Sequence, residues 1–339
     1  MKAVFFTKFG GPEVLEYGEF PSPQPQPGEA LVRVQACGLN HLDVWLRKGR
    51  SNIILPHIPG CDVAGVIEEI NGVCDFKQGQ EVVVNPAIPC GTCSRCVAGD
   101  DCELVVILGA RVKGGYAEYI TVPMYQLYAK PQNLSAVEAA AFPLTFLTAW
   151  HMLVGRAELK KSETVFVWGA SGGLGSAAVQ IANYLGAKVI AAAKSEAEAQ
   201  RLRELGAHEV AIYTQNKVGD VVKAFTEQRG VDAVFESVGK ETWATTLAIL
   251  RPLGRVVIAG TTSGDVIALN LSDIYVRQLT ILGARMGTRT EFEKVLELVQ
   301  SGVLKPIVDS VFLLSEAAAA QRRMEKREHF GKIVLKVSD

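Results

Sequence analysis

The chain has 339 residues, of which 48% are hydrophobic, and its 35 Lys and Arg against 36 Asp and Glu give a formal net charge of −1. This length suggests two domains of ordinary size, and the balanced charge argues against a broad nucleic-acid surface, which needs excess Lys and Arg. Without a signal-peptide core or an uninterrupted apolar run of membrane-spanning length, we expect a cytoplasmic protein that acts on a small molecule, not on nucleic acid or a membrane.

The first third of the chain contains short β-branched runs separated by turn residues, for example at residues 30–35, 63–70 and 81–84. This pattern predicts a mainly-β body with many turns.

From about residue 146 the pattern changes to apolar strands that alternate with helices, which predicts right-handed βαβ units and a parallel sheet. Gly186 and Gly206 stand where two of these helices end, as C′ glycines do. A long amphipathic helix over 291–301 and a closing strand at 331–335 follow. The predicted strands cover 164–168, 188–193, 209–213, 231–235 and 255–259, and the helices cover 172–185, 196–205, 217–228 and 241–250.

Residues 165–175 read as a strand, a glycine-rich turn and the start of a helix, in the pattern A-x-G-x-x-G. Gly172 lets the backbone approach a pyrophosphate, Gly175 allows close helix–strand packing, and the helix N-terminus offers free N–H groups to the anion. The position in a βαβ unit favours nucleotide binding over an ordinary tight turn. The predicted cofactor-binding residues here are Ala170, Ser171, Gly172, Gly173, Leu174 and Gly175.

The end of the second strand indicates which nicotinamide cofactor is used. NAD-binding versions usually place a carboxylate there to hold the ribose 2′-hydroxyl, but this chain has Ala193 followed by Lys194 and Ser195. Lys194 could neutralise a 2′-phosphate, whereas a solvated surface lysine is the alternative. Glu196 and Glu198 are attributed to the first turn of the next helix, where acids suit the dipole. The prediction favours NADP over NAD, with Lys194 and Ser195 as cofactor-binding residues.

Four of the seven cysteines lie in one short loop, at Cys90, Cys93, Cys96 and Cys102. The first three have the spacing C-x-x-C-x-x-C. In a cytosolic chain such a cluster favours a metal site over disulfides, and four thiolates match a closed, structural zinc site. Reduced exposed thiols, the alternative, would be an oxidation liability.

Taken together, these segments resemble the medium-chain dehydrogenase/reductase superfamily, the group of zinc alcohol dehydrogenases and quinone oxidoreductases. The likeness covers essentially the whole chain. It rests on GPEVLE at 11–16, GLNHLDVWLRKG at 38–49, PGCDVAGVIEEI at 59–70, the cysteine loop, GGYAEYITVP at 114–123, FPLTFLTAW at 142–150, GASGGLG at 169–175 and GKIVL at 331–335.

The resemblance implies an α/β protein in which a doubly wound Rossmann domain, 146–288, is inserted in a mainly-β GroES-like catalytic domain, 1–145 and 289–339. A zinc lobe would cover about 88–104, and a cleft between the domains would hold the nicotinamide. It also implies a homodimer or homotetramer, for which the apolar strand at 279–282 is a candidate pairing edge.

The positions that bind catalytic zinc in the alcohol dehydrogenases read Asn40, Cys61 and Leu144 here. Asn is a poor zinc ligand and Leu cannot bind, while a rearranged site using Cys61, with His57 and Asp62 nearby, stays open. Cys37 and Cys61 are otherwise small buried apolar residues. The spacing from Cys96 to Cys102 is two residues shorter than is usual in the superfamily.

The resemblance also implies roles for single residues. Asn40, Asp43 and Thr148 would line the nicotinamide and substrate end of the site as catalytic residues, although Asp43 could equally be a structural hydrogen-bond acceptor. His41 and Lys332 match positions that contact the cofactor pyrophosphate. Gly239 and Gly260 end later strands of the parallel sheet, where cofactor crevices form.

Without catalytic zinc to polarise a carbonyl, the acceptor itself must delocalise the developing charge, as quinones and α,β-unsaturated carbonyls do. N-H-L-D at 40–43 and LTAW at 147–150 resemble the quinone oxidoreductase branch. The sequence therefore predicts an NADPH-dependent reductase of such acceptors with a structural zinc. The alternatives are a zinc alcohol dehydrogenase or aldehyde reductase with a rearranged metal site, and a cofactor-binding protein with a structural or regulatory role.

Overall fold

The computed structural model describes residues 1–50, 53–98 and 102–337, and the chain divides into two compact units. One comprises Met1–Leu144 with Thr288–Asp339, and the other is Thr145–Gly287. Each boundary lies one residue from the expected one. Residues 99–101 of the expected zinc lobe and the last residues, 338–339, lie outside the described residues.

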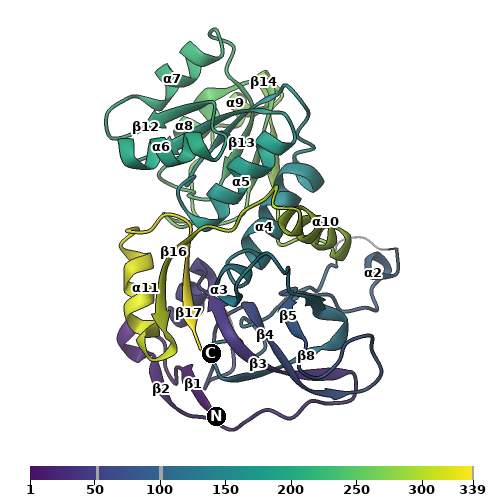
Figure 1. The fold of residues 1–339 in the computed structure, drawn as a ribbon. Coiled ribbons are helices and arrows are strands. Elements are labelled where there is room, and N and C mark those ends of the chain that lie inside the picture. The colour runs from purple at the N-terminus through teal and green to yellow at the C-terminus, as the bar shows by residue number, and fades with distance from the viewer. Residues whose placement is uncertain (51–52, 99–101, 338–339) are drawn as a thin grey trace. The chain divides into compact units, whose positions relative to one another are not determined.

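The unit Thr145–Gly287, described throughout, is built on a six-stranded sheet in the order β12-β11-β10-β13-β14-β15. Figure 1 labels β12, β13 and β14 of this sheet. Every pairing in it is parallel. Counted from β10, this is the doubly wound Rossmann order 3-2-1-4-5-6. The strands are β10 Thr164–Val167, β11 Lys188–Ala193, β12 Glu209–Ile212, β13 Val231–Glu236, β14 Leu250–Ile258 and β15 Thr280–Gly283, and the helices are α5 Gly173–Tyr184, α6 Glu196–Glu204, α7 Val218–Phe225, α8 Trp243–Ile249 and α9 Leu271–Arg277.

The sheet core follows the apolar pattern of the sequence. β10 and β13 are buried at every position, as strands covered on both faces are. The positive φ of Gly186, +76°, and of Gly206, +104°, fits their expected place after α5 and α6.

Two predicted helices end early for local reasons. α7 ends at Phe225, before Glu227 and Gln228, which have positive φ. α8 ends at Ile249 because Leu250 already pairs with Val231, so that β14 starts at Leu250 and not at residue 255.

The other unit is mainly β, as expected. Over residues 1–50, 53–98, 102–144 and 288–337 it holds a seven-stranded sheet in the order β16-β17-β3-β4-β5-β9, with β8 pairing to β3. Both ends of the chain contribute, because the C-terminal strand β17 lies between β16 and β3. The strands of this sheet are β3 Glu29–Gly38, β4 Asp62–Asn71, β5 Glu81–Val84, β8 Tyr119–Pro123, β9 Leu127–Ala129, β16 Val308–Leu313 and β17 Lys332–Lys336.

Short elements complete this unit, and α11 packs against β16 and β17 (Figure 1). Small antiparallel pairs are formed by β1 with β2 and by β6 with β7. These strands are β1 Lys2–Phe5, β2 Glu16–Glu19, β6 Ala87–Ile88 and β7 Val106–Ile107; the helices are α1 His41–Arg47, α2 Ser94–Ala98, α3 Ala136–Ala139, α10 Arg289–Gln300 and α11 Ala317–Glu325, with short 3₁₀ turns η1 Pro12–Val14, η2 Met124–Gln126 and η4 Leu314–Glu316.

The segment Ala136–Arg156 bears on the expectation that the chain has no uninterrupted apolar run of membrane-spanning length, because polar residues such as Glu138 and His151 interrupt it. It comprises α3, α4 Pro143–Trp150 and the π-helix η3 His151–Arg156, and by length and composition alone it is apolar enough to cross a membrane. Most of its apolar window, 78%, is buried within the protein. Burial of this kind is what a core helix shows, and such helices pass the same test of length and composition.

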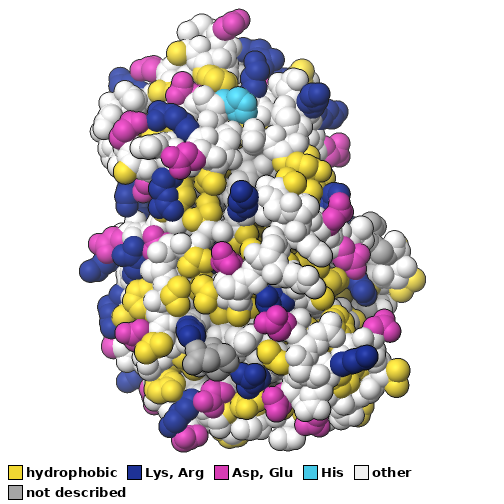
Figure 2. Space-filling model, viewed as in Figure 1, with side chains coloured by type: hydrophobic (Ala, Val, Ile, Leu, Met, Phe, Trp, Pro, Cys, Tyr) yellow, Lys and Arg dark blue, Asp and Glu magenta, His cyan; other side chains and the backbone are white. Residues whose placement is uncertain are grey.

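On the face drawn in Figure 2, acidic and basic side chains are interspersed.

Candidate functional site

The glycine-rich turn lies at the carboxyl end of β10, at the switch point of the sheet between β10 and β13. Gly172 is the N-cap of α5, with an extended backbone and no side chain to occupy the helix end. A Cβ on Gly175 would stand 2.1 Å from the carbonyl oxygen of Gly169, so only glycine allows α5 to pack this closely. The turn therefore has the form that cradles a pyrophosphate at a helix N-terminus.

Two further glycines named from the sequence follow neighbouring strands of this sheet. Gly239 (φ +96°) follows β13 and Gly260 (φ +120°) follows β14. A Cβ on Gly239 would lie 2.5 Å from the carbonyl oxygen of Gly264. Both positions thus require glycine for a backbone reason, at the edge where doubly wound sheets bind ligands.

Glu236, which the sequence analysis did not single out, organises the loop after β13. Its fully buried carboxylate accepts hydrogen bonds from the N–H groups of Val238 and Gly239, at 2.7 and 3.0 Å, and from the hydroxyls of Thr242 and Thr246, at 2.9 and 2.7 Å. These four donors satisfy both oxygens without a cation, and they hold the loop at the ligand-binding edge.

Lys194 and Ser195 do lie at the end of β11, but their surroundings differ from the expectation. Ser195 caps α6, because its hydroxyl accepts the N–H of Glu198 at 3.3 Å. Glu198 in turn folds back: its carboxylate accepts the backbone N–H of Lys194 at 3.0 Å and lies 3.5 Å from the Lys194 ammonium. The strand end therefore carries a carboxylate beside the lysine.

Thr148 lies on α4 and is buried, and its hydroxyl is 3.9 Å from the sulfur of Met286. Its role toward the nicotinamide stays a prediction.

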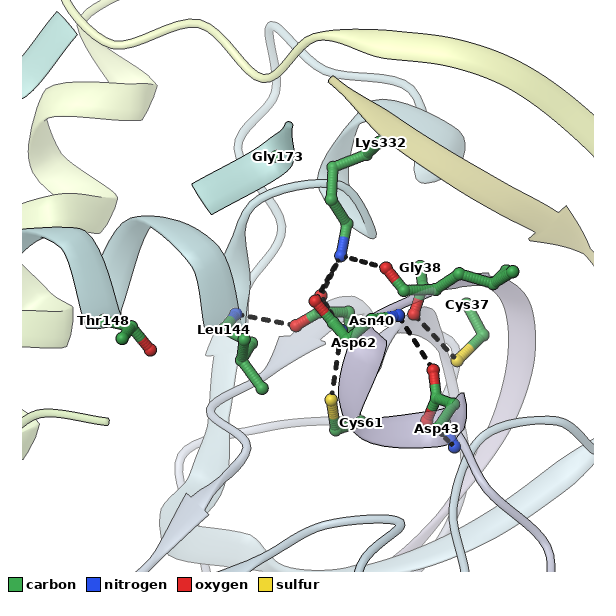
Figure 3. A network of polar contacts seen from close by, with 12 residues as sticks. Cys37, Gly38, Asn40, Asp43, Cys61, Asp62, Leu144, Thr148, Gly173 and Lys332 are labelled. Atoms are coloured by element: carbon green, nitrogen blue, oxygen red, sulfur yellow. Dashed lines mark hydrogen bonds and ion pairs between the residues drawn. The ribbon is translucent and has the colours of Figure 1, made fainter. Parts of the chain in front are cut away.

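In the other unit, Asn40 belongs to a buried polar network (Figure 3). Lys332, which enters from β17, donates from its ammonium to the carbonyl of Leu39, to Asn40 Oδ1 and to Asp62 Oδ2, at 2.6, 2.7 and 2.8 Å. Asn40 Nδ2 also donates to Asp62, at 2.8 Å. The second oxygen of Asp62 accepts the N–H of Leu144 at 2.7 Å.

This network defines the positions that correspond to the zinc ligands of alcohol dehydrogenases. The Cys61 sulfur lies 3.2 Å from Asn40 Nδ2, and burial, followed by the charges of Asp62 and Asp43, raises its pKa well above the usual range. Zinc binds the thiolate, so a metal here would first have to displace the proton of this buried thiol. With an amide at 40 and a leucine at 144, these residues do not fit a catalytic zinc.

Asp43 is a buried hydrogen-bond acceptor at the start of α1. It accepts the N–H of Asn40 at 2.8 Å, the N–H of Gly60 at 3.0 Å and the hydroxyl of Tyr116 at 3.1 Å. Burial raises its pKa to about 6, although these donors and the charge of Lys332 work in the opposite direction. Asp43 thereby fixes the turn that carries Asn40, in agreement with the structural alternative considered above.

His41 opens α1 next to Asn40. Burial, together with the positive charges of His329, Arg327 and Lys332, lowers its pKa to about 4. His41 is therefore neutral at pH 7, and the charges that act on it include the carboxylate of Glu325 as well as the cations. The contacts of His41 and Lys332 with a cofactor pyrophosphate stay predictions.

The four cysteines come together. Their sulfur atoms all lie within 4.8 Å of one another, and Cys90 and Cys96 are 3.8 Å apart. A tetrahedral site with zinc–sulfur bonds of about 2.3 Å has edges of about 3.8 Å. Backbone N–H groups point at Cys90, Cys93 and Cys102, and those of Thr92 and Cys93 lower the pKa of Cys90 to about 6. The shortened spacing thus still brings Cys102 to the site.

Among the described residues, the cysteine group is the one cluster of three or more His, Cys, Asp or Glu side chains whose ligand atoms lie close enough to hold a metal ion. Cys61, His57 and Asp62 do not form such a group, and a ring nitrogen of His57 lies 2.8 Å from the carbonyl oxygen of Gly109.

Two family models match the chain: the alcohol dehydrogenase GroES-like domain over residues 26–132 and the zinc-binding dehydrogenase domain over residues 173–301. Among curated relatives, an NAD-dependent alcohol dehydrogenase of Sulfolobus acidocaldarius is 36% identical, with 100% of both chains covered. A quinone oxidoreductase of Pongo abelii is 32% identical over 96% of this chain and 94% of its own. A crystal structure of an NAD-dependent alcohol dehydrogenase superposes with a TM-score of 0.96 at 43% identity, with 100% of both chains covered.

Proposed function

The chain belongs to the medium-chain dehydrogenase/reductase superfamily and is an oxidoreductase. From this premise we propose that it is an NADPH-dependent reductase of quinones or α,β-unsaturated carbonyls that works without catalytic zinc. The observation that carries the proposal is the Asn40–Asp62–Lys332 network. In support of the proposal, the positions that correspond to the catalytic metal ligands carry an amide, a buried thiol and a leucine, and the amide is bound to Asp62 and Lys332.

The residues of the Rossmann unit fit a dinucleotide. The turn at 170–175 would hold the pyrophosphate at the N-terminus of α5, and the end of β11 would face the adenosine ribose. When bound, the nicotinamide supplies the hydride. Since the residues at the metal-ligand positions do not fit a Lewis acid, the acceptor must spread the developing negative charge over its own conjugated system, as quinones and enones do.

In this scheme Asn40 and Thr148 are the polar side chains proposed to meet the substrate and nicotinamide. Asn40 is held at both ends of its amide, because Nδ2 donates to Asp62 and Oδ1 accepts from Lys332. Asp43 is a positioning residue that anchors the backbone N–H of Asn40.

Steady-state turnover of a quinone, an enone and a primary alcohol, each with both nicotinamide cofactors, tests this function. We expect the quinone or the enone to be turned over with NADPH. We also expect this rate to be the same whether or not the protein is supplied with metal in excess of one zinc per chain. Alcohol oxidation that disappears in Cys61→Ala together with a second zinc would overturn the proposal.

The second candidate is an alcohol dehydrogenase, which is favoured by the names of the relatives that are 36% and 43% identical. It would use a rearranged metal site. The same substrate panel decides between the two functions, because the carbonyl compound formed from a simple alcohol has no conjugated system to spread the charge.

We also propose that the cysteine group holds one structural zinc. The sulfur spacing and the N–H groups directed at three of the sulfurs support this assignment. A site with four protein ligands leaves no open position for substrate, so the metal would stabilise the loop at 90–102 and take no part in hydride transfer.

We propose, finally, a homo-oligomer that forms at the edge of the Rossmann sheet. β15 is the last strand in the sheet order, and Ile281 on it is exposed. Leu271, Tyr275 and Val276 of α9, which precedes β15 in the chain, are each about 70% exposed. An open strand edge flanked by apolar side chains is a typical pairing surface.

A further inference from the structure

The end of β11 holds a pair of opposite charges that the sequence pattern did not indicate. Glu198 is five residues beyond Ala193, on the first turn of α6, yet its side chain is only 12% exposed and is directed back at the strand end. It accepts the backbone N–H of Lys194 at 3.0 Å and lies 3.5 Å from the Lys194 ammonium.

The local backbone fixes this arrangement. Ser195 caps α6 by accepting the N–H of Glu198, while Glu198 accepts the N–H of Lys194, so the two bonds close the turn from both sides. The hydroxyl of Thr214, after β12, donates to the carbonyl of Lys194 at 2.8 Å. The carboxylate and the ammonium are therefore held at the same strand end.

This strand end is where dinucleotide-binding sheets distinguish the two cofactors: a carboxylate accepts the ribose 2′-hydroxyl of NADH, and a cation neutralises the 2′-phosphate of NADPH. Here both groups are present. The Glu198 carboxylate lies 3.5 Å from the Lys194 ammonium, so a 2′-phosphate that approaches Lys194 also approaches Glu198. Two negative charges a few ångströms apart near a protein surface repel each other appreciably.

We propose that Glu198 is a specificity-determining residue that limits the preference for NADPH conferred by Lys194. Its carboxylate competes with a 2′-phosphate for the lysine, and it offers an acceptor to the free 2′-hydroxyl of NADH. The proposal rests on the proposed function, since it assumes that the Rossmann unit binds a nicotinamide dinucleotide.

The test compares dissociation constants for NADPH and NADH, measured by titration calorimetry, in the parent protein, Glu198→Gln and Lys194→Gln. Gln at 198 keeps the size and one acceptor oxygen for the Lys194 N–H. We expect Glu198→Gln to raise the affinity ratio in favour of NADPH by roughly tenfold, and Lys194→Gln to shift it by a similar factor toward NADH.

Glu196→Gln is the matched control. It removes the same charge from the same helix turn, but the Glu196 carboxylate bonds to Arg203 at 2.8 Å and is 66% exposed. We expect its cofactor ratio to equal that of the parent.

Adenosine 2′-phosphate and adenosine serve as probes of the 2′ group alone. An unchanged NADPH-to-NADH ratio in Glu198→Gln, or an equal change in Glu196→Gln, overturns the role of Glu198 while leaving the enzyme assignment intact. If the parent protein binds neither dinucleotide, the proposed function itself fails.

Discussion

The buried Lys332–Asp62 pair allows a quantitative test of the network around Asn40. Lys332→Met removes the ammonium and keeps an unbranched side chain, so the cavity is small and the main effect is electrostatic. Asp62, which is fully buried, then retains the Asn40 amide and the Leu144 N–H as donors but loses its cation.

Removing one partner of a buried pair costs about 3–5 kcal/mol. Because Asp62 keeps two of its three donors, we expect the lower end, about 3 kcal/mol. A domain of this size changes its melting temperature by about 2–4 °C per kcal/mol, so the expected decrease is roughly 6–12 °C.

Far-UV circular dichroism in urea and on heating measures both quantities. Adding Asp62→Asn to Lys332→Met leaves no unpaired charge, so we expect the double variant to recover most of the loss. Lys2→Met is the control, because the Lys2–Glu19 pair is exposed and such pairs contribute about 0–1 kcal/mol. A loss below 1 kcal/mol in Lys332→Met, or a double variant as unstable as the single one, would refute the reasoning.

Three further predictions follow from other parts of the molecule. Burial raises the pKa of Asp43 from 3.8 to about 6, so the folded state binds this proton more tightly than the unfolded chain does, and the contribution of Asp43 to stability should fall by about 3 kcal/mol as pH rises from about 4 to about 6. Carboxyls with a lowered pKa, such as Asp232 and Asp309, contribute the opposite slope, so the quantity to measure by urea unfolding is the difference between the parent and Asp43→Asn across this range. Elemental analysis should find one zinc per chain, absent from Cys93→Ser, whose melting temperature should fall to that of the chelator-treated parent; equal zinc content in both would contradict the site. Tyr275→Glu should shift the molar mass by light scattering toward one chain, whereas Tyr17→Glu, at an exposed position of β2, should not.

Much of the Rossmann unit could be predicted because its signals are local. An apolar strand, a glycine turn and an amphipathic helix each occupy a short window, and β11 covers the predicted residues 188–193. The cysteine group could also be predicted from the sequence, since its four cysteines lie within thirteen residues, from Cys90 to Cys102. Errors occurred where pairing across the sheet decided the outcome, as at Leu250, which pairs with Val231.

The polar network around Asn40 could not be predicted, because its members are distant in the sequence. Lys332 is 270 residues from Asp62, and a lysine in a short closing strand gives no local sign of burial. Glu198 was missed for a different reason. Its position in the first turn of α6 has a sufficient explanation in the helix dipole, so nothing in the pattern indicated that its side chain returns to the strand before it.

The burial of Lys332 also bears on its expected contact with a cofactor pyrophosphate. An ammonium has three donors, and here they go to Leu39, Asn40 and Asp62. A direct hydrogen bond to a phosphate would require one of these to be released. Releasing Asp62 would leave a buried carboxylate without its cation, at a cost of about 3 kcal/mol or more, and releasing Asn40 would free the side chain proposed to face the substrate. Lys332 is therefore better suited to orient Asn40 than to bind the phosphate itself.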